Sequence, residues 1–275
     1  MRFAQIQEQI YCRPWFITSA AHFTIRQLFE NHLARHGFTA RADGTDFADF
    51  ANARRPMVVD GEGIATIHVF GPLGKNLSKV EKACGATSFE DVQSELALAN
   101  ANPLVRGILL HVDSPGGTVQ GTPETASLIA ESSAPVVAYT DGMMASAAYY
   151  LSAGAEKIVA TPSADVGSIG VYIPWVDHSA QYAAEGLKPD PIVNTGGDLK
   201  ALGFGGTLTE AQRAYLQEQV DRDFAAFQAH IAAHRAVDPA AMRGQTLSAD
   251  QAVSSNLVDF IGSLAEARAL LLAQS

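Results

Sequence analysis

Two hydrophobic periodicities alternate along the chain from about residue 63 onward. Short apolar runs of the kind found in buried strands are separated by segments in which apolar residues recur every three or four positions, as in helices. We predict strands over 64–70, 105–112 and 135–140, helices over 89–101 and 122–132, and later strands in KIVAT (157–161), SIGVYI (168–173) and PIVN (191–194). This order predicts an α/β domain with a largely parallel, buried sheet.

The first 58 residues have a more polar pattern. In FTIRQLFENHLARHG, apolar residues lie at helical spacing between Ile25 and Leu33, and Gly37 then favours a helix end. A charged stretch rich in small residues follows and indicates a linker. We therefore predict a helical N-terminal extension with its linker over 1–58 and the main domain over 59–275.

A long amphipathic helix is predicted over 207–235. Thr207 and Glu210 have the spacing of a capping box at its start. Its apolar stripe consists of Leu216, Val220, Phe224, Phe227 and Ile231. We expect this stripe to pack against the domain core or a neighbouring subunit.

Composition and charge narrow the classes of function. The chain is 47% hydrophobic, as in ordinary globular proteins, and its formal net charge is -10. Nucleic acid is an unfavourable partner, because affinity for it comes chiefly from clustered Lys and Arg. Cys12 and Cys84 lie far apart without metal-ligand spacing, so we expect two free thiols, no metal site and no cofactor.

The hydrophobic runs also bear on location. The most apolar run, over 143–155, is shorter than the roughly 20 residues that a membrane-spanning helix needs. Polar residues interrupt the N-terminal segment where a signal peptide needs a continuous apolar stretch. We therefore expect no membrane anchor and a cytoplasmic location.

Two loops after predicted strands carry candidate chemistry, DSPGG and DGMMAS. In open parallel sheets, ligands bind beyond the carboxyl ends of the strands. Taken alone, DSPGG would be an ordinary tight turn and Ser146 a helix cap. Together they supply what acyl transfer needs: a nucleophile at Ser146, and N–H donors to an oxyanion from Ala147 and from Gly116 or Gly117.

A serine hydroxyl needs a nearby base, usually His and less often Lys. His111 lies on a predicted strand and is expected to pack, and His178 is a weak candidate. His230 and His234 have the spacing of a zinc-protease helix but lack its Glu, so we expect them to be solvated.

Lysine is the remaining class of base. Lys157 and Lys188 have the sequence context of surface charges, whereas Lys200 ends the glycine-rich segment NTGGDLK. Such a loop can bring an amine close to another backbone. Spacing alone would still favour a surface position for Lys200, so the residues by themselves leave the base open.

Four segments together resemble the signal peptide peptidase A family of serine proteases, which includes the head-maturation proteases of tailed phages. They are DSPGG, MMASAAYYLSAGAEKIVATPSADVGSIGV, TGGDLKALG and GQTLSADQAVSSNLVDFIGS, in family order between about Ile64 and Leu271. The resemblance implies a ClpP/crotonase-like fold, a spiral of strand-strand-helix units. It also implies a homo-oligomeric ring in which serine and lysine can come from neighbouring subunits.

The resemblance further implies a Ser-Lys dyad in place of a triad. Ser146 matches the nucleophile, Lys200 the base, and Ser168 the serine that orients the lysine. Gly116 and Gly117 match the oxyanion-hole turn, which acts together with Ala147. The sequence GGDLK departs slightly from the commonest family form around the lysine.

The predicted function is therefore an ATP-independent serine endopeptidase of the phage or prophage head-maturation type, cleaving scaffold or capsid proteins in the host cytoplasm or procapsid. The soluble extension before the domain, with its segment IYCRPWFIT, favours this type over the membrane-anchored members. Three alternatives remain: a cytoplasmic enzyme that degrades peptides, a crotonase-like acyl-CoA enzyme, and a non-catalytic assembly protein.

Overall fold

The computed structural model describes residues 14–23, 25–27, 55–78, 81–82, 85–204 and 206–274. Cys12, Cys84 and most of the helix predicted after Ile25 lie outside these residues. None of the helices in the described ranges combines the length and apolar character needed to cross a membrane.

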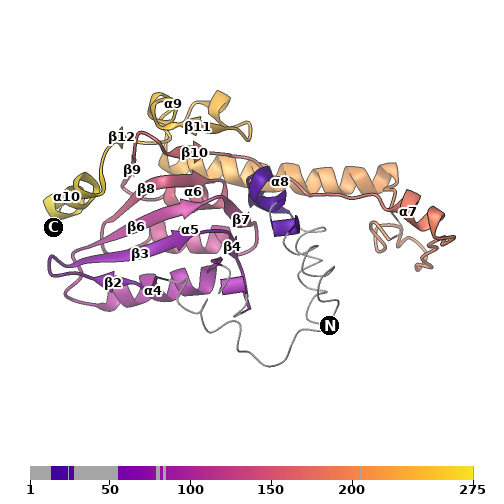
Figure 1. Ribbon diagram of the computed structural model, residues 1–275, viewed down its shortest axis with the longest axis horizontal. Helices are drawn as coiled ribbons and strands as arrows, with labels where there is room; N and C mark the ends of the chain where they lie inside the picture. The colour runs from indigo at the N-terminus through magenta and orange to yellow at the C-terminus, as the bar shows by residue number, and fades with distance from the viewer. Residues whose placement is uncertain are drawn as a thin grey trace.

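The centre of the domain is an eight-stranded sheet whose inner strands run parallel (Figure 1). Its main order is β11-β10-β8-β6-β3-β2, with β9 paired to β8 and β12 paired to β9. The predicted strands over 64–70, 105–112 and 135–140 form its middle as β3, β6 and β8. The bounds are β2 Val58–Val59, β3 Ile64–Phe70, β6 Gly107–Ser114, β8 Val136–Ala145, β9 Lys157–Ala160, β10 Asp165–Gly167, β11 Thr246–Ser248 and β12 Phe260–Ile261.

A second sheet of four short strands lies at the carboxyl end of β6. Its order is β1-β7-β4-β5, and β7 follows β6 after a single proline. The bounds are β1 Trp15–Ile17, β4 Leu73–Gly74, β5 Thr87–Ser88 and β7 Gly116–Thr118. The N-terminal extension is therefore not wholly helical, because its residues 15–17 form a strand of this sheet.

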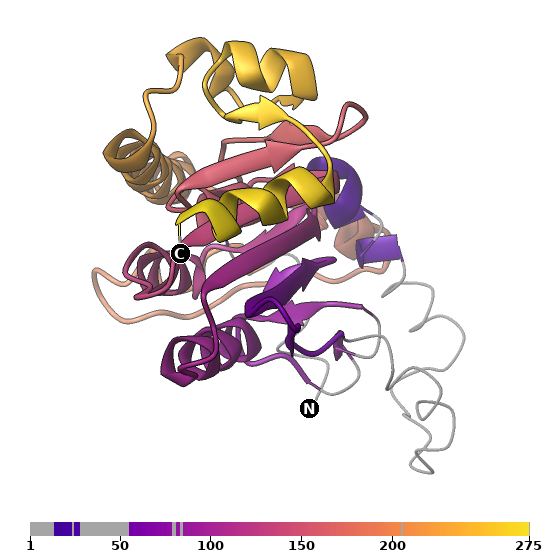
Figure 2. The same ribbon diagram turned by 90° about the vertical axis from the view of Figure 1, so that its left-hand side faces the viewer.

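Helices cover both faces of the large sheet (Figure 2). On β6, Leu110 and Val112 face a core shared with α4, α5 and α6, whereas Leu109 packs with Leu271 of α10 on the opposite face. The predicted helices over 89–101 and 122–132 are confirmed as α4 and α5. The bounds are α4 Phe89–Ala101, α5 Thr122–Ala130, α6 Ala147–Ser152, α9 Ala249–Ser254 and α10 Leu264–Gln274, with a 3-10 turn over Pro239–Ala241.

β8 is longer than the sequence predicted. We expected a turn after Thr140, but the strand continues to Ala145. The reason is that β8 has two successive partners on one edge, β9 opposite Val137 to Thr140 and β10 opposite Met143 to Ala145. The Asp113 carboxylate also accepts a 3.0 Å hydrogen bond from the Met143 amide, which holds the extended backbone beside β6.

Two strands predicted late in the chain are absent from the described structure. β10 ends at Gly167, and in the segment 168–173 only Tyr172 makes a β-bridge, with Trp15. Residues 191–194 form no strand and lie exposed, with Ile192 98% accessible. An apolar run becomes a strand only where a neighbouring strand or core accepts it, and this loop meets neither among the described residues.

The long helix α8 (Glu210–His234) begins two residues later than its predicted cap implies. Thr209 is its N-cap and forms a capping box with Gln212. Thr207 instead donates its hydroxyl to the Asp177 carboxylate at 2.7 Å. The predicted pairing of Thr207 with Glu210 is therefore wrong, because Thr209 offers the same chemistry two residues closer to the helix.

Only the C-terminal half of α8 packs on the domain; the N-terminal half projects from it (Figure 1). Phe227 and Ile231 of the predicted stripe are buried, whereas Leu216, Val220 and Phe224 are only partly covered. Residues 173–209, which include α7 (Ser179–Ala184), extend beside the projecting half. We call residues 173–209 with the first half of α8 the arm.

A buried ion pair ties the end of α8 to the sheet beneath α6. The Arg235 guanidinium lies 2.9 Å from Asp259 and donates to the carbonyl oxygens of Ala153 and Ala155. Burial alone would raise the pKa of Asp259, but the Ile158 amide and the Arg235 charge outweigh it and hold that pKa below its usual value. The pair therefore stabilises the fold only while Asp259 is ionised.

We expect Arg235→Ala to lower the free energy of unfolding by about 1 to 3 kcal/mol, because it removes one of the two cations beside the half-buried Asp259, which keeps Lys157 at 3.0 Å, and takes the donor from the Ala153 and Ala155 carbonyl oxygens. The contribution of Asp259 is present above its unfolded pKa of about 3.9 and is lost as the pH falls through its lower folded pKa. Urea unfolding at pH 7 and pH 3 measures both effects. Arg222→Ala, at an exposed pair with Asp223, is the matched control and should cost less than about 1 kcal/mol.

Candidate active site

Ser146 occupies a strained turn between β8 and α6. Its backbone has φ 55° and ψ -116°, a conformation that residues other than glycine rarely adopt. Two hydrogen bonds hold the turn: the Ser146 amide donates to Gly167 at 2.7 Å, and the Tyr150 amide donates to the Ser146 carbonyl at 2.8 Å. Such strain costs about 1–3 kcal/mol and tends to occur at functional sites.

The Ser146 hydroxyl is buried and has no hydrogen-bond partner among the described residues. It does not cap α6, because no side-chain cap bond forms at that helix end. A buried hydroxyl left unpaired costs about 1–3 kcal/mol, so its retention calls for another role. The purely structural interpretation of Ser146 as a helix cap is therefore wrong.

Gly116 brings the backbone of β7 against Ser146. Its φ is 103°, and a Cβ atom there would lie 3.0 Å from Ser146 Cβ and 2.1 Å from the Phe16 carbonyl oxygen. Only glycine allows this approach. The Gly116 amide donates to Ser114 Oγ at 3.2 Å in this arrangement. At Gly117 a Cβ would lie 1.9 Å from the Leu73 carbonyl oxygen, which requires glycine there too.

Ala147 is the first residue of α6 and directly follows Ser146. The first amides of a helix have no acceptor within the helix and favour negative charge. The backbones of Gly116 and Ala147 therefore both lie next to Ser146. Two amides in such positions can stabilise the negative charge that develops on a carbonyl oxygen when Ser146 attacks its carbon.

Ser168 lies beside Ser146 through the backbone of β10. The Gly167 carbonyl accepts the Ser146 amide, and Ser168 is the next residue, with φ 52° and a buried side chain. Its amide donates to the Gln245 carbonyl at 2.7 Å. The backbone bond from Ser146 to Gly167 thus places Ser168 one residue away from a direct contact of the Ser146 turn.

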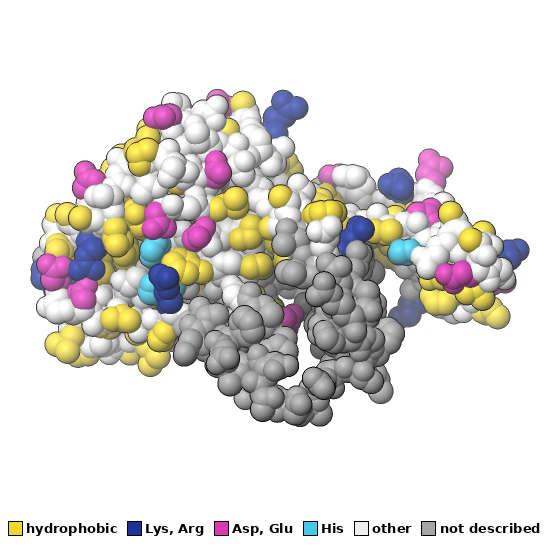
Figure 3. All heavy atoms as spheres, viewed as in Figure 1, with side chains coloured by type: hydrophobic (Ala, Val, Ile, Leu, Met, Phe, Trp, Pro, Cys, Tyr) yellow, Lys and Arg dark blue, Asp and Glu magenta, His cyan; other side chains and the backbone are white. Residues whose placement is uncertain are grey.

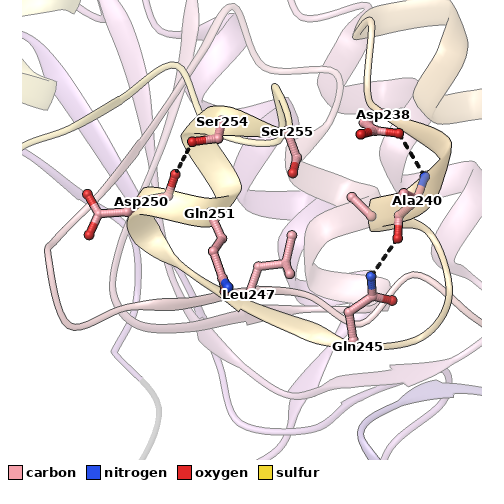
Figure 4. Close-up of a pocket in the computed structure, with 9 residues that line it drawn as sticks. Asp238, Ala240, Gln245, Leu247, Asp250, Gln251, Ser254 and Ser255 are labelled. Atoms are coloured by element: carbon pink, nitrogen blue, oxygen red, sulfur yellow. Dashed lines mark hydrogen bonds between the residues drawn. The ribbon is translucent and has the colours of Figure 1, made fainter.

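A surface hollow of about 340 Å³ is lined by residues between Asp238 and Ser255, among them Gln245, whose carbonyl accepts from Ser168 (Figure 4). Two of its polar side chains form hydrogen bonds to nearby backbone carbonyl groups. Gln245 donates to the Ala240 carbonyl at 2.7 Å, and Ser254 donates to the Asp250 carbonyl at 2.8 Å. We interpret the hollow as part of the frame that positions Ser168, not as a binding site.

Lys200 does not approach Ser146 within one chain. Its loop adjoins the start of α8, where Gln212 donates to the Asp198 carbonyl at 3.0 Å. Tyr150, one turn after Ser146, packs instead on Phe227 near the other end of α8. These two points of α8 are separated by about 22 Å along the helix axis, beyond the reach of a lysine side chain.

The arm nevertheless holds the Lys200 loop in a defined place. The Trp175 indole donates to the Gly206 carbonyl at 3.0 Å, and the Lys200 amide donates to the Gly197 carbonyl at 2.8 Å. The Lys200 side chain itself is exposed. The arm also carries exposed apolar side chains, among them Leu187, Ile192 and Phe204 (Figure 3). The surface around Lys200 thus has the character of a contact surface.

His230 is not solvated, contrary to our prediction. Its ring stacks on Tyr150 with centroids 4.1 Å apart, and its Nε2 lies 3.0 Å from the Tyr150 carbonyl. Burial lowers the pKa of His230 to about 4, so the ring is neutral at pH 7. A carbonyl oxygen only accepts, so Nε2 carries the proton and cannot take one from Ser146. His234 is exposed, as expected.

The other histidines considered are placed away from the nucleophile. His111 packs among His68, Phe70 and Tyr139, as predicted, and its Nε2 lies 3.0 Å from an Asp141 carboxylate oxygen. His178 is the exposed N-cap residue before α7 on the arm. Neither supplies a base at Ser146.

The sequence interpretation missed the residues that cover Ser146. Phe16 of β1 lies with Tyr150 and Phe227 in one aromatic cluster, and Tyr172 bridges to Trp15. The available signal was the apolar triplet WFI between a proline and a threonine in an otherwise polar segment.

Two protein-family models match the chain. The model for peptidase family S49 matches residues 129–274, which carry Ser146, Ser168 and Lys200. The model for Clp protease matches residues 78–167, from the second sheet to β10. Together with the parallel sheet, this match confirms the predicted α/β fold of the ClpP/crotonase type.

Individual relatives include proteases and a phage head-tail preconnector protein. The chain is 29% identical to the capsid assembly protease C of Escherichia phage lambda, over 66% of this chain and 42% of that protein. It is 32% identical to the head-tail preconnector protein GP5 of Enterobacteria phage P21, over 50% and 28%. It is 27% identical to protease 4 of Salmonella typhi, over 68% and 31%. The chain thus spans less than half the length of each of these three relatives.

The S49 match covers more than half of the chain and includes the strained turn at Ser146. It agrees with the resemblance to signal peptide peptidases found in the sequence. The chain belongs to peptidase family S49.

Proposed function

We propose that the chain is an ATP-independent serine endopeptidase in which Ser146 is the nucleophile and Lys200 the general base. The observation that carries the proposal is the buried, unpartnered Ser146 hydroxyl on a strained turn, next to the amides of Gly116 and Ala147. No acyl-CoA chemistry needs a serine in this position.

The geometry around Ser146 supports the following steps. Ser146 Oγ attacks the scissile carbonyl carbon while its proton passes to the neutral Lys200 amine. The negative charge on the carbonyl oxygen is stabilised by the amides of Gly116 and Ala147. Lys200 then returns the proton to the leaving amine, and water hydrolyses the acyl-enzyme. Ser168, beside Ser146, positions the lysine.

We further propose that Lys200 acts on the Ser146 of a neighbouring subunit. Within one chain the arm carries Lys200 away from Ser146, and it presents the lysine beside exposed apolar side chains such as Ile192 and Phe204. Docking of this arm on an adjacent copy would bury those side chains and bring the lysine to a second active site. A closed ring repeats this head-to-tail contact around its axis.

The proposed substrates are scaffold and capsid proteins of a phage or prophage, cleaved in the host cytoplasm or procapsid. This part of the proposal is supported by two relatives, a capsid assembly protease and a head-tail preconnector protein. The negative net charge gives no support to nucleic acid as the substrate.

A fluorophosphonate probe tests the assignment of the nucleophile. On prolonged incubation of the assembled protein, we expect one adduct, which peptide mapping by mass spectrometry places on Ser146, because only an activated serine reacts with such probes. Ser168 serves as the internal control and should stay unlabelled. A protein that is assembled, fails to react at Ser146 and leaves a coexpressed scaffold protein intact would contradict the proposal.

A further inference from the structure

β1 lies in a slot between two segments of the domain. On one side it pairs antiparallel with β7, with Phe16 opposite Gly117 and Ile17 opposite Gly116. On the other side, Trp15 exchanges two backbone hydrogen bonds with Tyr172, at 3.0 and 3.4 Å. A segment bonded on both edges in this way is bound as proteins bind an extended peptide by strand addition.

The backbone of β1 runs past the nucleophile. Because Trp15 directs its polar groups toward Tyr172, the alternation of an extended strand directs those of Phe16 toward Gly117. The Phe16 carbonyl oxygen and the Ser146 Cβ both lie at the Cα of Gly116, where a methyl group would meet them at 2.1 and 3.0 Å. β1 therefore follows the path that a peptide must take to present a carbonyl to Ser146.

The side chain of Phe16 fills an aromatic pocket next to the nucleophile. Its ring centroid lies 5.8 Å from that of Tyr150 and 4.8 Å from that of Phe227, and it is 1% exposed. Tyr150 belongs to the first turn of α6 after Ser146. The pocket is thus formed by the nucleophile's own helix and by α8, and it accepts a large apolar side chain.

β1 also closes the site to solvent. Ser146 is 0% exposed, and no external carbonyl can reach it in this arrangement. The other groups around Ser146 belong to β7, β8, α6 and β10, whereas β1 is a three-residue strand contributed by the N-terminal extension. Displacement of β1 would remove one wall of the site without unfolding these elements.

We propose that β1 is an internal blocking strand that occupies the substrate channel, and that the preferred substrates are extended segments that place a large apolar side chain in the Tyr150–Phe227 pocket, as Phe16 does. This inference rests on the proposed peptidase function. The N-terminal extension then restrains the enzyme until a substrate strand replaces β1.

The test compares the full chain with Phe16→Ala, which empties the pocket and weakens β1. We expect fluorophosphonate labelling of Ser146 to become at least about tenfold faster in the variant, because a larger fraction of molecules is open. Phe23→Ala is the matched control, a phenylalanine of the same extension that is 54% exposed, and it should label at the wild-type rate. Circular dichroism verifies that each variant is folded.

A synthetic peptide PWFITSA, which copies β1, provides an independent measurement. We expect it to inhibit peptide cleavage by the Phe16→Ala variant, whereas the same peptide with alanine in place of phenylalanine should inhibit much less. If Phe16→Ala does not fold, Thr18→Pro takes its place, since it removes the amide that donates to the Pro115 carbonyl at 3.0 Å, together with the hydroxyl that accepts from the Ala21 amide at 3.4 Å.

The outcomes separate the blocking strand from the peptidase itself. Equal labelling rates for wild type and variant, or slower labelling of the variant, would overturn the blocking role while leaving Ser146 as the nucleophile. A folded, assembled variant in which Ser146 never labels would overturn the proposed function as well.

Discussion

Ser146→Ala is expected to abolish peptide cleavage, with a loss of at least about 10⁴-fold in kcat. The substitution removes the only atom that can form the acyl-enzyme, whereas the amides of Gly116 and Ala147 remain. The measurement is cleavage of a peptide substrate by the assembled protein, followed by mass spectrometry of the products.

Ser146→Ala should not destabilise the fold, although it abolishes activity. The Ser146 hydroxyl makes no hydrogen bond among the described residues, so its removal should leave the free energy of unfolding unchanged or slightly higher. Ser152→Ala is the matched control, a serine of the same helix that is equally buried and donates to the Ala148 carbonyl at 2.8 Å. It should retain activity. Full activity of Ser146→Ala, or equal losses in both variants, would refute the nucleophile assignment.

The central sheet could be predicted because its information is local. The strands over 64–70 and 105–112 are short, largely apolar segments whose core-facing residues are buried, and the predicted helices that follow them have clear periodicity. The predicted strand ended at Thr140, five residues before the end of β8, because Asp141 and Gly142 are typical turn residues. The length of β8 depends on β9 and β10, which follow later in the chain.

The active site divides in the same way. Ser146, Gly116 and Ala147 lie in short segments whose chemistry is visible in sequence, and the structure places their backbones next to one another. β1 could not be predicted, because its partner strand β7 lies about a hundred residues later and three apolar residues carry no periodicity. His230 was misjudged because its burial depends on Tyr150, 80 residues earlier.

Lys200 is the residue for which sequence and single-chain structure disagree most. The family resemblance pairs it with Ser146, yet its loop adjoins the start of α8, far from the Tyr150 pocket. The disagreement disappears if the pairing partner is another copy of the chain. The structure of a single chain does not contain such a contact. The exposed apolar side chains of the arm favour a contact surface but do not identify its partner.

Mixing two inactive variants distinguishes these arrangements. Lys200→Ala alone should lose activity about as completely as Ser146→Ala. In coassembled rings of both variants at equal amounts, a lysine supplied by the neighbour restores about one site in four, the fraction with an intact serine beside an intact lysine. Lys188→Ala, an exposed lysine of the same arm, is the matched control and should stay active.

The activity recovered in mixed rings distinguishes a dyad within one chain from a dyad shared between neighbouring chains. If each chain completes its own dyad, every chain in the mixture lacks one of the two groups, and no arrangement of subunits can restore a site. Mixed rings of verified composition that stay inactive would therefore require the arm to fold back onto its own domain, with α8 bent or broken between Gln212 and Phe227. Recovery to about a quarter would instead assign the arm as the element that joins subunits and completes each active site.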